Sequence, residues 1–215
     1  MKIGVFGGSF NPVHFGHVRV AQAALKELSL DRLIVLPAAV SPFKTGADTV
    51  ATPSVLADRR LEMVHDAFDA LPRTVVDERE LRRGGVSYAI DTVREIAAEN
   101  PGAELVFIIG EDSVAGLPRW KEWDELRTLC SFKAFPRTPE SSTAIRALFA
   151  GAEVRLNPEE KLVSAVRAGL RRKEGFCPCR LPKSPEFFCP CDEFKGQLAD
   201  KEFHGLCHCR LYLKP

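Results

Sequence analysis

The chain carries Gly7-Gly8-Ser9-Phe10-Asn11-Pro12-Val13-His14-Phe15-Gly16-His17 near its start, and this stretch decides the fold. The apolar run from Lys2 to Phe6 predicts a short buried strand before it, and helical spacing of apolar residues from Val18 to Leu28 predicts a helix after it. The stretch therefore joins a strand end to a helix start, where free backbone N–H groups and the helix dipole favour an anion. Because glycine has no Cβ, its backbone can approach a phosphate closely. We predict a phosphate-binding loop here.

Two histidines, His14 and His17, stand in this loop on either side of Gly16 and can reach one point beside the first helical turn. An imidazole donates hydrogen bonds to phosphate oxygens, on which charge develops during phosphoryl transfer. A tight turn would by itself explain the glycines, with the histidines incidental to it. The pattern His-x-Gly-His at a strand–helix junction instead favours a nucleotide site. The stretch resembles the signature of HxGH nucleotidylyltransferases, and in full it is similar to that of nicotinate mononucleotide adenylyltransferases. The resemblance implies contacts to ATP from Gly7, Gly8, Ser9, Phe10, His14 and His17.

Composition limits the classes of protein to which the chain can belong. Its 215 residues can form one medium domain and a small one. Lys and Arg total 30 against 29 for Asp and Glu, so no excess charge predicts broad binding to nucleic acid or to a membrane surface. The sequence has no apolar run long enough to span a membrane and no signal-peptide pattern, which predicts a cytoplasmic protein. A homo-oligomer stays open.

Strand and helix patterns alternate through the first two thirds of the chain. This order predicts an α/β fold, a Rossmann-like doubly wound parallel sheet with helices on both faces. Ligands of such sheets bind at the carboxyl ends of the strands. After the first strand and helix, the predicted strands are 33–36, 74–77, 104–109 and 131–135, and the predicted helices are 54–68, 88–99 and 122–129.

Further landmarks of the nicotinate mononucleotide adenylyltransferase family follow in family order. Ser41-Pro42-Phe43-Lys44 resembles the family's Pro-x-x-Lys-type loop, whose lysine, here Lys44, would meet the ATP phosphates. Residues 87–92 resemble the Ser-Tyr-x-x-Asp-Thr segment that holds the pyridine nucleotide. The resemblance implies substrate contacts from Ser87, Tyr88 and Thr92.

Two more landmarks stand further along the chain. Residues 107–113 are similar to the family's strand and acidic turn, so Gly110 and Asp112 would face ATP, and Trp120 would stack on the nicotinate ring. Each of these residues, taken alone, has an ordinary structural explanation. Lys44 would be a solvated lysine, Trp120 a packing residue and Asp112 a helix cap. Six such pieces in family order favour the functional interpretation. The last piece resembles the Ser-Ser-Thr-x-x-Arg motif that grips the ATP phosphates, here Ser141, Ser142, Thr143 and Arg146.

The resemblance implies transfer of AMP from ATP to nicotinate mononucleotide, giving nicotinate adenine dinucleotide and pyrophosphate in NAD biosynthesis. His14, His17, Lys44 and Arg146 would stabilise charge with the help of Mg²⁺. In the family a few dozen residues, including a strand, precede the Ser-Ser-Thr motif, whereas here Phe135 leads almost directly to Ser141. Two alternatives therefore stay open. One is a nucleotide-binding redox or sensor protein without transferase activity, and the other is an adenylyltransferase for another phosphate-bearing acceptor such as phosphopantetheine.

The last third of the chain is rich in cysteine. A helix is predicted from an N-cap at Asn157 to about Arg172. Six of the seven cysteines follow in three Cys-x-Cys units, at 177–179, 189–191 and 207–209. In a reducing compartment such a group indicates metal or redox chemistry rather than structural disulfides. The units can supply four thiolates to a [4Fe–4S] cluster and leave two thiols for a disulfide, and a zinc site with four cysteines is the alternative.

The segment from about Leu156 to Leu213 resembles the catalytic chain of ferredoxin:thioredoxin reductase, which has Cys-Pro-Cys, Cys-Pro-Cys and Cys-His-Cys in this order. Its spacing departs from that family, with a shorter first gap and a longer second one. The resemblance implies a small, mostly helical iron–sulfur domain at 153–215 after an adenylyltransferase-like domain at 1–152, with ferredoxin or a thioredoxin-like protein as partner. It also implies cluster ligands at Cys177, Cys189, Cys191 and Cys207, a redox-active pair of Cys179 and Cys209, and a proton donor at His208.

Overall fold

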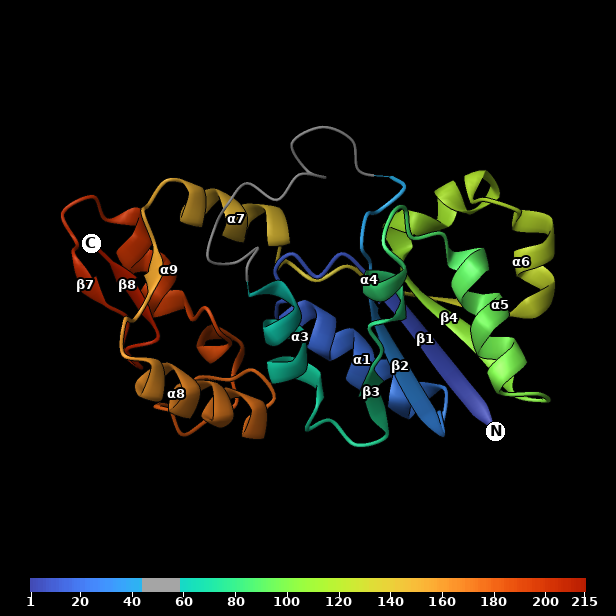
Figure 1. The fold of residues 1–215 in the computed structure, drawn as a ribbon, viewed down its shortest axis with the longest axis horizontal. Helices are drawn as coiled ribbons and strands as arrows, with labels where there is room; N and C mark the ends of the chain where they lie inside the picture. Colours follow the sequence, from blue (N-terminus) through green and yellow to red (C-terminus); the bar gives the residue numbers. More distant parts are fainter. Residues whose placement is uncertain (44–58) are drawn as a thin grey trace. The chain divides into compact units, whose positions relative to one another are not determined.

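The computed structural model describes residues 1–43 and 59–215, and these form two compact units (Figure 1). We call the first the sheet unit; its described residues are 1–9, 16–43 and 72–139. We call the second the cysteine unit; its described residues are 10–15, 59–71 and 140–215. The compact units therefore do not coincide with a single division of the chain near residue 152, and the predicted domain boundary stays a prediction.

The sheet unit contains the parallel sheet that the sequence predicts. Its strands lie in the order β3-β2-β1-β4-β5, and every neighbouring pair is parallel. The first strand runs beyond the predicted end at Phe6, so Gly7 and Gly8 belong to it. The strands are β1 (Lys2–Gly8), β2 (Arg32–Pro37), β3 (Thr74–Val76), β4 (Glu104–Gly110) and β5 (Ser131–Phe135).

Helices cover both faces of this sheet. Parallel crossovers are right-handed, so the β1-to-β2 and β3-to-β4 connections, which step in opposite directions, place their helices on opposite faces. On one face, Ile3 and Val5 of β1 share a core with Ile90 and Leu126 from the helices. The helices of the unit are α1 (Phe15–Glu27), α4 (Arg79–Arg83), α5 (Ala89–Glu99), the 3₁₀ segment η2 (Glu111–Arg119) and α6 (Trp123–Leu129).

The cysteine unit combines helices with a small antiparallel sheet of order β6-β8-β7. In its core the ring of Phe149 lies 5.6 Å from that of Tyr212, which stacks on Phe194 at 5.5 Å between ring centroids. The sequence predicted a mostly helical unit and missed this sheet, because strands of two or three residues show no alternation. The elements are α3 (Arg60–Phe68), α7 (Ser142–Ala150), β6 (Arg155–Leu156), α8 (Glu160–Arg172), the 3₁₀ turn η3 (Pro185–Phe187), α9 (Asp192–Ala199), β7 (Gly205–Leu206) and β8 (Tyr212–Lys214).

Two helix starts differ from the predicted ones by two residues or more. Helix α1 begins at Phe15 rather than near Val18, so His17 lies in its first turn. Helix α8 begins at Glu160, because the Asn157 backbone N–H donates to the Leu211 carbonyl and holds that residue in the strand connection. Residues 54–58 of a third predicted helix lie outside the described residues, within which α3 begins at Arg60. Over the described ranges, the structure contains no helix that is both long and apolar enough to cross a membrane.

Candidate active site

A cavity of about 540 Å³ opens at the carboxyl ends of β1 and β4 in the sheet unit. The chain leaves these two neighbouring strands in opposite directions, and such a switch point is where doubly wound sheets bind ligands. Gly7 and Gly8 line the cavity from β1, and Ile109 and Gly110 line it from β4. The position therefore agrees with the one that the sequence predicts for ATP and its acceptor.

Two of these glycines, Gly7 and Gly110, have the side chains of other residues close to their Cα atoms. A Cβ on Gly7 would stand 3.3 Å from the Phe107 ring, and a Cβ on Gly110 would stand 2.5 Å from a carboxylate oxygen of Asp112. The Asp112 carboxylate thus folds back over β4, where it also pairs with Arg137 at 3.2 Å. Asp112 itself is not among the residues that line the cavity.

Aromatic side chains form one wall of the cavity. The ring of Trp120 stands edge-on to that of Phe107, with centroids 5.5 Å apart, and lies 5.8 Å from that of Phe43. Tyr88 also lines the cavity, and the ammonium of Lys121 lies 4.8 Å from its ring. A flat heteroaromatic ring can stack on such a wall. The sequence indicated Trp120 and Tyr88 but not Phe107 or Lys121, which stand beside recognised motif residues without a pattern of their own.

Ser87 and Thr92, both predicted to contact the acceptor, hold other protein groups in this structure. The Ser87 hydroxyl lines the cavity and accepts a hydrogen bond of 2.9 Å from the Ala39 backbone N–H. Thr92 is fully buried, and its hydroxyl donates to a carboxylate oxygen of Glu80 at 2.7 Å. Glu80 lines the cavity, and no sequence motif had indicated it.

The two motif histidines belong to different compact units. His17 lies in the first turn of α1, with its ring centroid 6.4 Å from that of Phe6, which lines the large cavity. His14 belongs to the cysteine unit, where it lines a smaller cavity of about 60 Å³ together with Glu140 and Cys189. Lys44, the third predicted catalytic group, lies outside the described residues.

The Ser-Ser-Thr-x-x-Arg motif forms the start of α7 in the cysteine unit. The Ser141 hydroxyl caps the helix by accepting a hydrogen bond of 3.3 Å from the Ala144 backbone N–H, as a helix start requires. Ser142 donates to the Pro12 carbonyl at 2.9 Å. Arg146 donates to the Asn11 carbonyl at 2.5 Å and to the Thr143 hydroxyl at 3.2 Å. This motif therefore holds the backbone of the loop that carries His14.

The six grouped cysteines gather in the cysteine unit as thiols. The sulfurs of Cys207 and Cys209 are 3.7 Å apart, and Cys177 also shares a hydrogen bond with Cys209. Hydrogen bonds from the Cys209 thiol lower the pKa of Cys177 to about 6 and that of Cys207 to about 7.

The four predicted cluster ligands lie near one another. Burial raises the pKa of Cys189 and of Cys191, and the charges of Cys177 and Cys207 raise both further. The described residues contain no group of three or more His, Cys, Asp or Glu side chains placed to hold one metal ion. Each cysteine of a [4Fe–4S] cluster binds a different iron, so its ligands need not converge on one point. The arrangement of the described residues therefore supports neither a [4Fe–4S] cluster nor a zinc site, and the ligand set stays a prediction.

Cys179, the predicted partner of Cys209 in a disulfide, has different surroundings. It is the one thiol of the six that is exposed, and the nearby Leu181 is 97% exposed. Partial desolvation raises the pKa of Cys179, and the charge on Cys177 adds to the shift. The predicted proton donor His208 stands with its Nδ1 3.9 Å from a Glu193 carboxylate oxygen.

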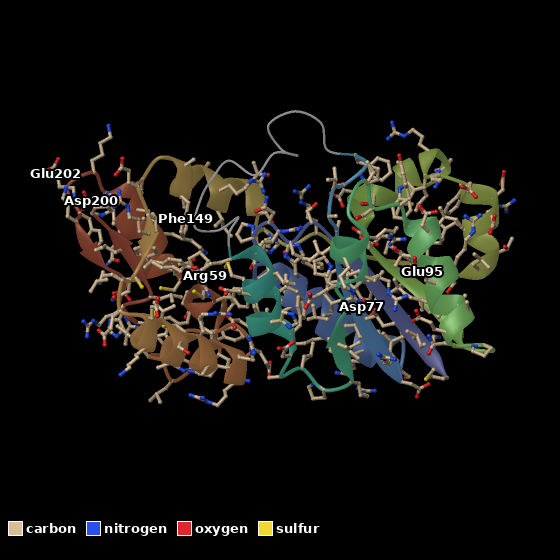
Figure 2. All side chains as sticks on the ribbon, viewed as in Figure 1. Arg59, Asp77, Glu95, Phe149, Asp200 and Glu202 are labelled. Atoms are coloured by element: carbon tan, nitrogen blue, oxygen red, sulfur yellow. The ribbon has the colours of Figure 1, made fainter. Side chains whose placement is uncertain are left out.

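Arg59 is buried inside the cysteine unit, and the sequence gave no sign of its role (Figure 2). Its guanidinium donates to the Tyr212 hydroxyl at 2.8 Å and to Asp66 at 3.4 Å. Burial lowers the pKa of Arg59, but Tyr212, Cys189 and Asp66 outweigh it and hold the pKa above its ordinary value. The half-buried Cys189 therefore has a fixed positive charge near its thiol.

A glycine-lined strand end at the switch point of a parallel sheet, beside an aromatic wall, defines a nucleotide-binding α/β protein. The model of the Cytidylyltransferase-like family matches residues 5–167, and the chain belongs to this family. It is 46% identical over 128 residues to a "Probable nicotinate-nucleotide adenylyltransferase" of Albidiferax ferrireducens, covering 60% of this chain and 62% of that protein. A protein of the same name from Symbiobacterium thermophilum is 38% identical over 176 residues, covering 80% and 82%. The chain thus spans about three fifths of the first relatives that it matches.

Solved structures support the fold. A Vibrio parahaemolyticus protein provisionally assigned as a nicotinate-nucleotide adenylyltransferase aligns with a TM-score of 0.54 at 21% identity, over 70% of this chain and 89% of that one. The Plasmodium falciparum nicotinic acid mononucleotide adenylyltransferase, solved in complex with NaAD, aligns with a TM-score of 0.50 at 14% identity, over 68% and 83%. At these identities the similarity concerns the fold alone.

Proposed function

We propose that the chain transfers AMP from ATP to nicotinate mononucleotide. The observation that carries the proposal is the cavity of about 540 Å³, whose lining includes both a glycine-containing strand end and the Trp120–Phe107 wall. A phosphate fits the first surface and a pyridine ring the second. The names of the curated relatives support the same activity.

The reaction needs alignment more than a covalent catalyst. A phosphate oxygen of the mononucleotide attacks the α-phosphorus of ATP, the α–β bridging bond breaks, and pyrophosphate leaves with the electron pair. The transfer becomes fast when both reactants are held in line and charge on the phosphoryl oxygens is neutralised. We assign that neutralisation to His14, His17, Lys44 and Arg146, and the holding of the mononucleotide to Tyr88 and Trp120.

The protein supplies little of a Mg²⁺ site by itself. Among the described residues that line the cavity, Glu80 is the one carboxylate, and protein hydroxyls already occupy it. Mg²⁺ commonly keeps several waters and binds mainly through substrate phosphates, so we expect it to enter with ATP. When bound, it would supply positive charge at those phosphates.

Pyrophosphate release by the purified full chain tests this function. ATP would be offered with nicotinate mononucleotide, nicotinamide mononucleotide or phosphopantetheine, and the products separated by chromatography. We expect release with a pyridine mononucleotide, because phosphopantetheine has no flat ring for the Trp120 wall. Release with phosphopantetheine alone would identify phosphopantetheine, and not a pyridine mononucleotide, as the acceptor. ATP binding without any release would favour the nucleotide-binding sensor.

A second function is proposed for the cysteine unit, namely reduction of a partner disulfide at a [4Fe–4S] cluster. The supporting observation is the contact of Cys209 with both Cys177 and Cys207, beside the exposed Cys179. When bound, a cluster would supply single-electron transfer. Two electrons, delivered one at a time by a ferredoxin-type donor, and two protons convert the partner disulfide into two thiols. A thioredoxin-like protein is the partner that we propose.

Purification without oxygen tests this second function. Iron and acid-labile sulfide would be measured, followed by reduction of a thioredoxin-like disulfide with reduced ferredoxin as electron donor. Four irons and four sulfides per chain, with visible absorbance and disulfide reduction, are expected on this proposal. Zinc in the protein, or a cluster without any disulfide reduction, would contradict the assignment.

A further inference from the structure

Glu80 has an unusual position in the sheet unit. It belongs to the short helix α4, is 6% exposed and lines the large cavity. The other charged residues lining that cavity are Arg119 and Lys121, so Glu80 is its one carboxylate over the described parts of the chain. A buried carboxylate at a site for anionic substrates needs a reason, because it weakens the attraction for those substrates.

Two hydroxyl groups converge on this carboxylate, and each is itself bonded to a further group. Thr92 of α5 donates to it at 2.7 Å, and Ser87, in the segment before α5, also hydrogen-bonds to it. The Ser87 hydroxyl accepts in turn from the backbone N–H of Ala39, just after β2. A guanidinium N–H of Arg83 completes the network by donating to the Thr92 hydroxyl at 2.7 Å. Glu80 thereby ties together the segments that follow β2 and precede α5.

Tyr88 stands between the two residues that the carboxylate holds. The segment after β2 also leads to Phe43, whose ring faces Trp120 on the cavity wall. The network therefore reaches the chain segments that carry both aromatic side chains. Hydrogen bonds to an ionised group are about twice as strong as neutral ones, so the charge stiffens the arrangement.

The network has a cost to folding. Burial raises the pKa of Glu80 despite the hydroxyls of Thr92 and Ser87. A group whose pKa is raised in the folded state opposes folding once the pH exceeds that pKa. A residue that costs stability beside a ligand cavity is typical of a functional position.

We propose that Glu80 is a positioning residue for the acceptor nucleotide, acting through the Ser87 and Thr92 hydroxyls on Tyr88 and on the segment after β2. The role rests on the proposed adenylyl transfer to a pyridine mononucleotide. It also changes the interpretation of Ser87 and Thr92, which hold Glu80 rather than the substrate. Glu80 does not touch the reacting atoms.

Glu80→Gln in the full chain tests this role, because it keeps the size and one acceptor oxygen but removes the charge. Calorimetry would measure binding of nicotinate mononucleotide and, separately, of ATP. We expect the dissociation constant for the mononucleotide to rise about tenfold, while that for ATP stays within about twofold. The melting temperature should stay equal or rise, because a neutral amide is less costly to bury than a carboxylate.

The matched control is Glu95→Gln. Glu95 of α5 pairs with the same Arg83 at 3.1 Å, but it is half exposed and lies outside the cavity lining (Figure 2). We expect no change in mononucleotide binding. Ser87→Ala should weaken binding about as much as Glu80→Gln, and the double variant no more than either, because both changes break one network.

Three outcomes would overturn the role of Glu80. They are unchanged mononucleotide binding in Glu80→Gln, an equal loss in Glu95→Gln, and an equal loss of mononucleotide and ATP binding in Glu80→Gln. If the wild-type chain does not bind the mononucleotide at all, the proposed function fails, and the role of Glu80 fails with it. If the wild type binds and Glu80→Gln binds equally well, only the role of Glu80 fails.

Discussion

The sheet unit and the cysteine unit bury charged side chains for different purposes. In the sheet unit, neutral hydroxyls surround the Glu80 carboxylate at the edge of a large cavity. In the cysteine unit, the Arg59 guanidinium is enclosed by Asp66 and Tyr212 close to a half-buried thiol. The first arrangement shapes an open site for a ligand, whereas the second supports an interior with thiols. The comparison teaches that a buried charge is balanced by neutral hydroxyls beside a cavity in the first unit, and by a carboxylate and a phenol within an interior in the second.

The largest expected effect concerns iron in the cysteine unit. Cys189→Ser should lose the cluster almost completely, because a [4Fe–4S] site requires four thiolates. Iron and sulfide analysis of protein purified without oxygen measures the cluster content. Cys130→Ser is the matched control, since Cys130 is a buried thiol of the sheet unit whose pKa burial raises to about 12. Equal iron content in Cys189→Ser and Cys130→Ser would contradict a cluster bound by the cysteine unit.

The next effect concerns catalysis in the sheet unit. His17→Ala should lower turnover about 10²–10³-fold, the loss that follows removal of one charge-stabilising donor. Binding of nicotinate mononucleotide should change little, because the role proposed for His17 is to stabilise charge on the transferred phosphoryl group. Steady-state pyrophosphate release measures both quantities. Turnover near the wild-type value in a folded variant would remove the histidine from the mechanism.

A smaller effect is expected for the aromatic wall. Trp120→Ala should raise the Michaelis constant for the mononucleotide about tenfold and leave that for ATP nearly unchanged, because stacking of one base contributes about 1–3 kcal/mol. Trp123→Ala is a useful control, since Trp123 packs on Phe132 in the same core but does not line the cavity. Equal changes for both substrates would make Trp120 a packing residue.

The two tyrosines of the chain offer a comparison of stability. Tyr212→Phe removes the hydroxyl that accepts from buried Arg59, which should destabilise the cysteine unit by about 1–3 kcal/mol. Tyr88→Phe in the sheet unit should change stability by less than about 0.5 kcal/mol, because that side chain is partly exposed. Hydrogen exchange with mass spectrometry measures each unit separately. Equal effects would show that the Arg59 contact contributes nothing.

The smallest effect concerns pH, with opposite signs in the two units. Asp77 is partly buried, but hydrogen bonds from Arg79 outweigh that burial and lower its pKa (Figure 2). The contribution of Asp77 to stability is therefore complete above about pH 4 and is lost as the pH falls through the lowered pKa. Burial raises the pKa of Asp66, although the positive charge of Arg59 opposes the shift. The contribution of Asp66 to stability is therefore complete at low pH and is lost as the pH rises through the raised pKa. Hydrogen exchange of β3 and α3 between pH 7 and 3, compared with Asp77→Asn and Asp66→Asn, measures the two slopes. Slopes of the same sign would contradict both assignments.

The sequence predicted the sheet well, because the parallel strands are short apolar runs separated by helical patterns. The positions of Gly7, Gly110, Tyr88 and Trp120 around one cavity also follow from strand ends that share one edge of the sheet. The motif did not indicate that the hydroxyls of Ser87 and Thr92 bond Glu80, because Glu80 lies outside the motif. Their predicted contacts to the acceptor stay predictions. The catalytic and ligand assignments stay predictions.

By itself the sequence determined the parallel sheet, the glycine pair at the end of its first strand and the gathering of six cysteines in one segment. Each depends on neighbours in the chain or on a simple repeat, and local physics is enough to specify it. Only the tertiary structure decided that Glu80 holds Thr92 and that Arg59 donates to Tyr212, a residue 153 positions away. Burial selects such partners, because a charged group removed from water must bind whichever polar groups the fold brings beside it.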